Sequence, residues 1–146
     1  MERISRNELY LSIAFLISRR GTCERLQVGA VITRDNRIVA TGYNGPLKDS
    51  KHCQEAGCNK DDACYRSIHA EANAIYFAAR YGISLEGCTL YITHSPCLKC
   101  SEAIINSGIK EVVYSHNYRD SDPVYFLMQN NINCIQELLK EHEEKI

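Results

Sequence analysis

Strand-like and helix-like segments alternate from residue 68 onward, and this order constrains the fold more than any other feature of the sequence. Two strands separated by a helix pair in parallel, because a tight turn can join only antiparallel strands. Gly82 and Gly108 stand where two of the helical patterns stop. The pattern predicts a helix over 68–81, a strand over 89–93, a helix over 96–107, a strand over 111–114, a helix from 121 to about 131, and then a strand with a frayed helical end after 132.

The first 43 residues predict a helix followed by a hairpin. Ser5 opens a capping-box pattern before an apolar stripe, and Gly21 can end this helix. Strand patterns over 29–33 and 37–43 flank an Asp-Asn pair that suits a tight turn. Together with the alternation downstream, these elements predict an α/β sandwich in which a mostly parallel sheet begins with an antiparallel hairpin.

Composition and charge indicate one compact domain over 1–146. The 146 residues are 45% hydrophobic and 24% charged, a balance typical of globular proteins. Apolar runs stay far below the roughly 20 residues that span a membrane. The first six residues lack the apolar core of a secretory signal, so we expect a cytoplasmic protein with no membrane partner.

The charge distribution argues against a nucleic-acid partner. A net charge of −1 gives no general attraction to a polyanion. The first 37 residues nevertheless hold seven arginines and no lysine. These arginines either offer a local site for a small anionic group or form solvated surface charge.

Eight cysteines in a chain expected in a reducing compartment indicate metal ligands or reactive thiols rather than disulfides. Three of them lie in a polar stretch over 44–66 that shows no helix or strand period. A loop of about 20 residues is uncommon in a compact domain unless it is functional or tied down. Metal binding is therefore the first hypothesis, whereas Cys88 and Cys134, on predicted strand edges, are expected to be small hydrophobic residues.

Metal-binding residue types also occur at the starts of two predicted helices, in His-Ala-Glu at 69–71 and Pro-Cys-Leu-Lys-Cys at 96–100. Cys97 and Cys100 are three residues apart, so they share one face of the first helical turn. One imidazole, from His69, and two thiolates hold a catalytic zinc and leave its fourth position open to water. Glu71 would then lie beside that water as a proton shuttle.

Two other interpretations of these residues stay open. Each half of the pattern also occurs by itself, His-x-Glu by chance and Cys-x-x-Cys in redox pairs or structural zinc sites. A structural zinc would need a fourth protein ligand, for which His94 is the nearest histidine.

His-x-Glu followed by Pro-Cys-x-x-Cys is the signature of zinc deaminases that act on nucleobases. Further stretches extend the match: Val-Gly-Ala-Val-Ile at 28–32, Thr-Gly-Tyr-Asn-Gly at 41–45, Ile-His-Ala-Glu-Ala-Asn-Ala-Ile at 68–75, Tyr-Ile-Thr-His-Ser-Pro-Cys at 91–97 and Ser-Gly-Ile-Lys at 107–110. Over roughly residues 8 to 135 the chain resembles the deoxycytidylate (dCMP) deaminase family. It is also similar to the phage members of that family and to the competence-operon deaminase-like proteins of Gram-positive bacteria.

The resemblance implies a three-layer α/β/α sandwich with a cytidine-deaminase-like, mixed five-stranded sheet. It implies a zinc-dependent hydrolase that converts dCMP to dUMP, the precursor of thymidylate. Zinc would lower the pKa of a bound water and Glu71 would take its proton, so that hydroxide attacks the ring carbon that bears the amine. It further implies a homo-oligomer, most simply a hexamer and otherwise a dimer or tetramer, and it makes dCTP and dTTP candidate effectors, with regulation left open by the sequence.

The resemblance also assigns substrate contacts. Asn44 looks like the residue that contacts the sugar and ring, although Asn-Gly also suits a turn. Tyr118 matches a tyrosine that reaches the substrate, with packing as the alternative. Phe77 and Arg80 match positions near the pocket and the subunit contacts, or else are a core residue and a solvated charge. Ala70 is carried over to the substrate site with them.

Some phage members bind a second, structural zinc, and four cysteines of this chain stand in the corresponding regions. Cys23 and Cys53 fit that pattern, whereas Cys58 and Cys64 stand where the family uses histidines. The resemblance therefore implies a closed site of four cysteines, in which His52 is able to replace one of them. Free buried thiols are the alternative.

Three other questions stay open at this point. Arg25, just before the first strand, is a plausible partner for a phosphate. The same chemistry would also serve a deaminase of cytidine, deoxycytidine or a tRNA adenosine. A non-catalytic zinc accessory protein related to the competence-operon proteins is a further alternative, although such a protein has no use for the carboxylate of Glu71.

Overall fold

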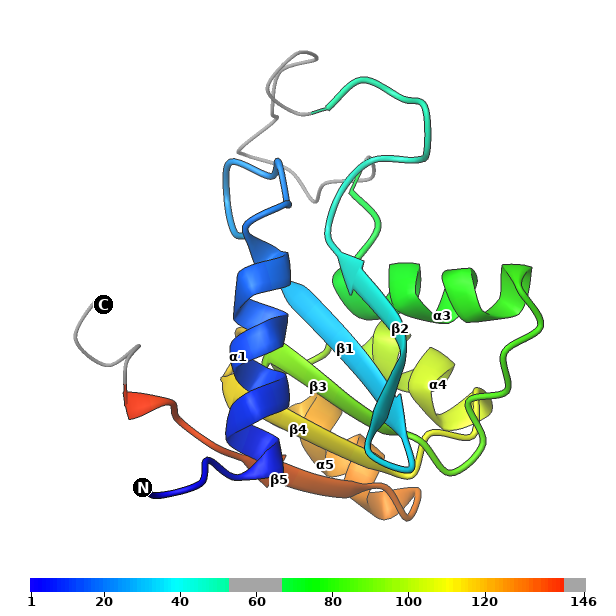
Figure 1. The fold of residues 1–146 in the computed structure, drawn as a ribbon. Helices are drawn as coiled ribbons and strands as arrows, with labels where there is room; N and C mark the ends of the chain where they lie inside the picture. Colours follow the sequence, from blue (N-terminus) through cyan, green and yellow to red (C-terminus); the bar gives the residue numbers. More distant parts are fainter. Residues whose placement is uncertain (53–66, 141–146) are drawn as a thin grey trace.

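The computed structural model describes residues 1–52 and 67–140, and most of the predicted segments are confirmed to within about two residues (Figure 1). The frayed helical end predicted after the last strand lies largely outside the described residues, which stop at 140. The elements are α1 (Arg6–Ser18), β1 (Gly29–Arg34), β2 (Arg37–Tyr43), α3 (Ala70–Arg80), β3 (Thr89–His94), α4 (Leu98–Asn106), β4 (Glu111–His116), α5 (Asp122–Gln129) and β5 (Asn133–Gln136).

The strands form a mixed five-stranded sheet in the order β2-β1-β3-β4-β5. The predicted hairpin joins β1 and β2, and its two turn residues, Asp35 and Asn36, have φ of 50° and 59°. Such a turn matches the right-handed twist of the strands that it connects. The strand β1 is also antiparallel to β3, whereas β3, β4 and β5 run parallel. The expected mostly parallel sheet with an antiparallel first hairpin is confirmed, because β2, β3, β4 and β5 run in one direction and β1, inserted between β2 and β3, runs in the other.

Helices cover both faces of the sheet and make a three-layer α/β/α sandwich, as expected (Figure 1). Successive strand residues point to opposite faces, so alternate positions of one strand serve different layers. On one face α1 packs against Val31, Tyr91 and Val113. On the other face the sheet residues pack against α3, α4 and α5, with Ala30, Ile32, Leu90, Ile92, Val112, Ala70, Ala74, Ala78, Ile104 and Leu127 in that core.

A close approach between β2 and α3 depends on Gly42. A Cβ at this position would lie 2.2 Å from the carbonyl oxygen of Ala70 and 2.7 Å from the backbone nitrogen of Ala74. Both atoms belong to the helix backbone, so a side chain at 42 would have to displace α3 itself. Since His69 directly precedes α3, this contact also sets the position of His69.

Replacing Gly42 by Ala is expected to destabilise the protein by about 1–3 kcal/mol, because an overpacked contact forces the backbone to shift. Gly45→Ala is the matched control, since the nearest atom to a Cβ at 45 is 3.8 Å away. Urea and thermal unfolding of both variants measure the difference. Equal stability of the two variants would show that the close contact does not hold α3 in place.

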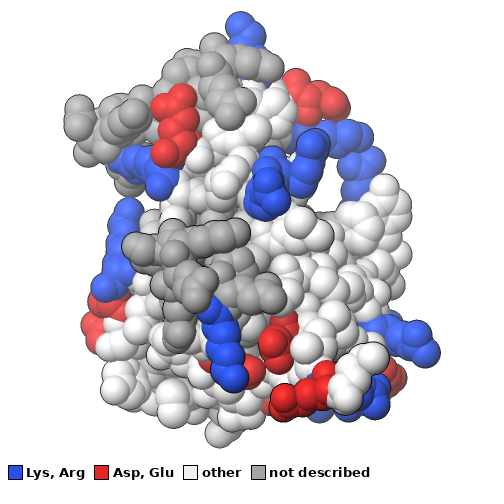
Figure 2. All heavy atoms as spheres, turned by 60° about the vertical axis from the view of Figure 1, so that its left-hand side comes forward, with Lys and Arg blue, Asp and Glu red and all other residues white. Residues whose placement is uncertain are grey.

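In the described parts of the chain, no helix is both long enough and apolar enough to cross a membrane. Basic side chains gather in the upper part of the face shown in Figure 2, next to acidic ones. The segment that follows α1 lies at this upper end of the molecule in Figure 1, and it contributes the exposed Arg19, Arg20 and Arg25. These three arginines are thus surface residues in the segment between α1 and β1.

Candidate metal centre and active site

The segment that carries His69 is anchored to the end of β2. Gly45 and Ile68 exchange two backbone hydrogen bonds, Gly45 N to Ile68 O at 3.1 Å and Ile68 N to Gly45 O at 2.7 Å. The side-chain amide of Asn73 donates to the carbonyl of Tyr43 at 2.9 Å. These bonds fix the entry of the chain into α3, where His69 is the N-terminal cap residue.

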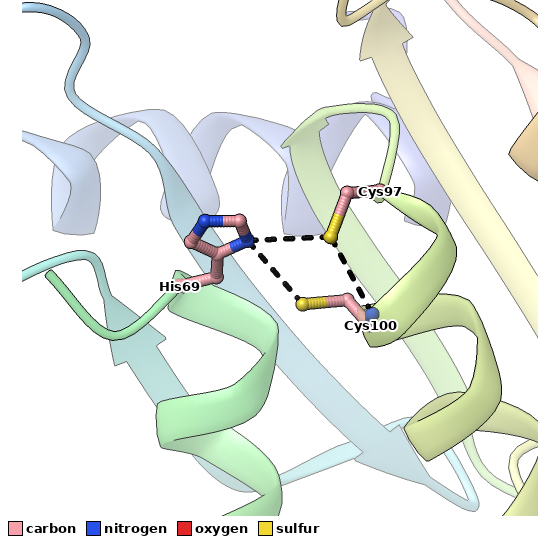
Figure 3. Close-up of side chains that lie close together, drawn as sticks. All are labelled: His69, Cys97 and Cys100. Atoms are coloured by element: carbon pink, nitrogen blue, oxygen red, sulfur yellow. Dashed lines mark hydrogen bonds between the residues drawn. The ribbon is translucent and has the colours of Figure 1, made fainter. Parts of the chain in front are cut away.

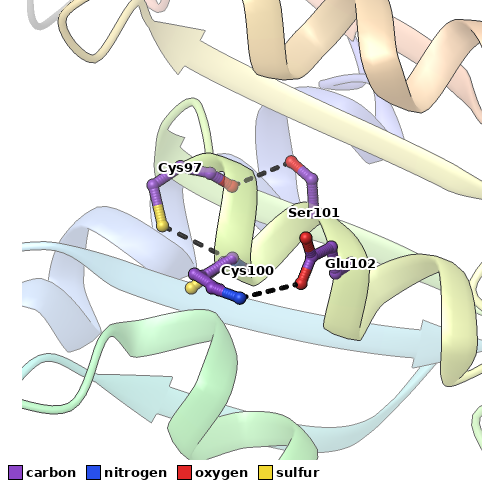
Figure 4. A network of polar contacts seen from close by, with 5 residues as sticks. Cys97, Cys100, Ser101 and Glu102 are labelled. Carbon is purple, nitrogen blue, oxygen red and sulfur yellow. Dashed lines mark hydrogen bonds and ion pairs between the residues drawn. The ribbon is translucent and has the colours of Figure 1, made fainter.

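The first turn of α4 holds both cysteines of the second motif. Cys97 is the N-terminal cap residue, and its sulfur accepts a hydrogen bond from the backbone N–H of Cys100 at 3.5 Å (Figure 4). The buried hydroxyl of Ser101 donates to the carbonyl oxygen of Cys97 at 2.9 Å. Lys99 and Glu102 form an exposed ion pair on the outer side of the same turn. The turn is therefore held in shape by its own hydrogen bonds.

The two helix starts bring His69, Cys97 and Cys100 together (Figure 3). Their ligand atoms all lie within 4.8 Å of one another. The Nδ1 atom of His69 is 3.5 Å from the sulfur of Cys97 and 3.4 Å from that of Cys100. A tetrahedral zinc with bonds of about 2.0 Å to nitrogen and about 2.3 Å to sulfur separates such atoms by about 3.5 Å. The three side chains thus fit zinc, and His94 is not a member of this cluster.

The pKa values of the two thiols are shifted in opposite directions, which favours the thiolate form of one of them. A hydrogen bond from the Cys100 side chain lowers the pKa of the Cys97 thiol to about 3. The same hydrogen bond, together with burial, raises the pKa of Cys100. The hydrogen bond with Cys97 raises the pKa of His69. Zinc binding therefore has to displace the proton of the Cys100 thiol, since cysteine binds a metal as the thiolate.

Glu71 lies beside the ligand cluster without belonging to it. It stands in the first turn of α3 and is only 3% exposed. Burial raises the pKa of its carboxyl group, while a hydrogen bond with the Cys100 side chain acts in the opposite direction. A buried carboxyl group next to a metal site is placed to exchange a proton with a reactant rather than with bulk water.

A cavity of about 250 Å³ opens at these residues. The charged or titratable groups of its lining include two arginines, Arg25 and Arg119, the carboxyl group of Glu71 and the thiol of Cys97. Both arginines are exposed, whereas Glu71 is buried, so the arginines stand nearer to solvent than the carboxylate. The complete lining is Cys23, Arg25, Leu26, Val28, Asn44, Ser67, His69, Ala70, Glu71, His94, Ser95, Cys97, Tyr118 and Arg119.

Three of the substrate residues expected from the sequence line this cavity: Asn44, Ala70 and Tyr118. The side-chain amide of Asn44 is already engaged, because it accepts from the N–H of Val28 at 2.8 Å and donates to the carbonyl of Leu26 at 2.7 Å. Asn44 thus holds the segment before β1 as one wall of the cavity. The role of Tyr118 and Asn44 toward a substrate stays a prediction.

Phe77 and Arg80 do not line the cavity in the described part of the chain. Both are exposed on α3, and the ring of Phe77 lies tilted against that of Tyr81, the residue after α3, with centroids 4.8 Å apart. Tyr76 and Tyr81 are exposed in the same region of the chain. The expected part of Phe77 and Arg80 in subunit contacts stays a prediction, as does the hexamer.

Sequence reasoning missed Arg119. This residue follows β4 and has a φ of 62°, a left-handed conformation that is uncommon for a side chain larger than glycine. Its guanidinium lies 5.1 Å from the ring centre of Tyr118, whose backbone N–H donates to the hydroxyl of Ser95 at 2.7 Å. The parallel pairing of β3 and β4 was the available signal, because it places the residues after both strands at the same edge of the sheet.

The expected second zinc site lies partly outside the described residues, which include Cys23 but not Cys53, Cys58 or Cys64. Cys23 is half-buried. The hydroxyl oxygen of the neighbouring Thr22 lies 3.0 Å from Nδ1 of His52. The chain before β1 and the chain after β2 therefore meet next to Cys23.

Cys88 and Cys134 pack as small hydrophobic residues, as expected. Cys88 is fully buried and Cys134 lies half-buried on β5. Burial raises the pKa of both thiols, which keeps them in the protonated, unreactive form.

The fold and the His/Cys/Cys site define a domain of the zinc-dependent deaminase class. The family model of the cytidine and deoxycytidylate deaminase zinc-binding region matches residues 4–116, and the chain belongs to this family.

Two relatives and one solved structure illustrate the match. ComE operon protein 2 of Bacillus subtilis (strain 168) is 46% identical over 120 residues, which cover 82% of this chain and 64% of that protein. The deoxycytidylate deaminase of Enterobacteria phage T4 is 36% identical and covers 77% of this chain, which spans 79% of its length. The dCMP deaminase of cyanophage S-TIM5 in complex with dCMP and dUMP superposes with a TM-score of 0.85 at 31% identity, over 94% of this chain and 100% of that one.

Proposed function

We propose that this protein hydrolyses dCMP to dUMP and ammonia with the help of zinc. The observation that carries the proposal is that His69, Cys97 and the buried Glu71 line the same cavity as two arginines. A metal site and a proton carrier at a cavity that also presents cationic side chains suit an anionic substrate that undergoes hydrolysis. The dCMP deaminases among its relatives support the same substrate.

Glu71 carries the protons in the proposed reaction. Zinc held by His69, Cys97 and Cys100 supplies the Lewis acid that activates a water molecule at neutral pH. Glu71 takes one proton of this water as the water oxygen bonds to the ring carbon that bears the amine, and donates that proton to the ring nitrogen. Glu71 then takes the remaining proton of the new hydroxyl group and donates it to the leaving amine, so that the carbonyl forms, the carbon–nitrogen bond breaks and ammonia departs.

The arginines favour a nucleotide over a nucleoside as substrate. A guanidinium binds a phosphate through parallel charge-assisted hydrogen bonds. The guanidinium of Arg119 lies over the ring of Tyr118 and forms no ion pair with any described residue. Its N–H groups are therefore available to an anion. Arg25 lines the same cavity.

An assay of the zinc-loaded protein with dCMP, CMP, deoxycytidine and dCTP tests the proposal. It measures the release of ammonia and of the product in which uracil replaces cytosine. The highest kcat/KM is expected for dCMP. Turnover of deoxycytidine in preference to dCMP would contradict the nucleotide assignment. A zinc-bound protein that deaminates none of these substrates would instead favour an accessory role, for which the similarity to ComE operon protein 2 is the specific observation.

Arg119→Gln is expected to raise KM for dCMP about tenfold or more, because a hydrogen bond to a charged group contributes about 1.5–3 kcal/mol. KM for deoxycytidine should change much less, since that substrate has no phosphate. Arg37→Gln, which removes an exposed arginine on β2 away from the cavity lining, serves as the control. Equal effects of Arg119→Gln on both substrates would rule out a phosphate contact.

We also infer a second zinc, held by Cys23 with cysteines from 53–64. Elemental analysis should then find two zinc ions per chain, and Cys23→Ser should lose one of them and lower the melting temperature, since a closed zinc site contributes folding energy. Cys134→Ser, at a half-buried thiol on β5, should keep both ions. A wild-type protein with one zinc per chain would eliminate the second site.

A further inference from the structure

The cavity is lined by an imidazole, that of His94, which the proposed zinc chemistry does not use. His94 ends β3, three residues before Cys97, and it is half-buried. It lies outside the cluster of metal ligands. The role of His94 therefore depends on what its two ring nitrogens bind.

One ring nitrogen is bound to a buried threonine. Thr93 is fully buried, and its hydroxyl oxygen accepts from the N–H of Gly29 at 3.3 Å. Nδ1 of His94 lies 2.8 Å from the same oxygen. A buried hydroxyl has one proton and needs an acceptor for it. Among the described residues that acceptor is Nδ1 of His94, so the Thr93 hydroxyl donates to this nitrogen.

The consequence is a defined tautomer of His94. A nitrogen that accepts a hydrogen bond carries no proton, so the proton of the neutral ring is on Nε2. Because the Nδ1 edge faces the buried Thr93, the Nε2 edge is left for the cavity that His94 lines. His94 therefore presents an N–H donor there.

The ring is also held neutral and in place. Burial, together with the adjacent His116, lowers the pKa of His94 to about 4. His116 is the register partner of His94 on β4, with ring centroids 5.5 Å apart. Phe15 of α1 packs edge-on against His116. These ring contacts restrict the orientation of the His94 side chain.

We propose that His94 is a substrate-binding residue whose Nε2–H, oriented by the hydroxyl of Thr93, donates a hydrogen bond to an oxygen of the nucleotide. The inference rests on the proposed function for the identity of the ligand. An N–H donor binds an oxygen that accepts a hydrogen bond, and it does not bind an amino group, which presents hydrogens of its own. The neutral ring of His94 adds no charge to a cavity that already holds two arginines.

Kinetics of two variants test the contact. His94→Phe keeps an aromatic ring and removes the donor, and KM for dCMP is expected to rise about tenfold, the effect of one lost hydrogen bond, with kcat within about threefold. His94→Gln restores an N–H donor and should recover most of the affinity. An unchanged KM in His94→Phe, or no recovery in His94→Gln, would overturn the proposal.

The tautomer is measured separately by ¹⁵N NMR of the zinc-loaded full chain, with the His94 signals assigned from their loss in His94→Gln. A protonated Nε2 and an unprotonated Nδ1 are expected. Thr93→Val should change this pattern and raise KM, whereas Thr33→Val, at a buried threonine on β1 outside the cavity lining, should change neither. A protonated Nδ1 in the wild type would overturn the assignment. A wild type that deaminates no cytosine nucleotide would defeat the proposed function, and the NMR result would still decide the tautomer.

Discussion

A Glu71→Gln protein is expected to bind zinc like the wild type and to deaminate dCMP about 10²- to 10⁴-fold more slowly, the usual contribution of a positioned proton carrier. The carboxyl group is 3% exposed in the first turn of α3 and is not one of the clustered ligands. The amide of glutamine has nearly the same shape, but it cannot take a proton from water. Steady-state kinetics and elemental analysis on the same preparation measure both quantities.

Glu102→Gln is the matched control, because Glu102 is a carboxylate on α4 that pairs at the surface with Lys99. Its activity should equal that of the wild type, since surface ion pairs contribute little. A Glu71→Gln protein that turns over dCMP at the wild-type rate would refute the assignment of Glu71 as the proton carrier.

His69→Ala is expected to lose one zinc ion per chain and, with it, all measurable deamination. Two thiolates remain, and the three-ligand set of a catalytic zinc is broken. The removed imidazole is also the group that stands about equally close to both sulfur atoms, at 3.5 Å and 3.4 Å. Zinc content after dialysis, followed by the activity assay, checks the prediction.

Lys99→Ala controls for a change in the same turn of α4, since the Lys99 side chain is 89% exposed and lies between the two cysteines in sequence. This variant should keep its zinc and its activity. If His69→Ala retained the full zinc content of the wild type, another side chain would have to complete the site, and the His/Cys/Cys assignment would be wrong.

The two main predictions separate binding from chemistry. Glu71→Gln removes the proton carrier and leaves the three ligands in place, whereas His69→Ala removes a ligand and leaves the carboxyl group. Loss of activity with zinc retained in the first variant, and loss of both in the second, would distinguish the two roles.

Local patterns were sufficient to predict the elements and the metal-binding pattern. Ser5 caps α1 by accepting from the N–H of Glu8, as its sequence context indicates. The Asp-Asn pair at 35–36 makes the turn of the hairpin. The spacing of Cys97 and Cys100 places both thiols in one helical turn. Each of these features depends on residues within about four positions of one another, so sterics and hydrogen bonding of the local chain decide them.

The tertiary structure alone decided the order of the strands and which further side chains join the site. It inserts β1 between β2 and β3, and it places Arg119, after β4, in the cavity that also holds Glu71. Burial of Glu71, which raises the pKa of its carboxyl group, depends on the layers around it. The engagement of Asn44 by backbone groups 16 and 18 residues earlier was likewise invisible in the sequence. Such contacts join distant segments, and the pattern of propensities along the chain predicts the parallel pairing of strands that a helix connects but not the burial and hydrogen bonds of individual side chains.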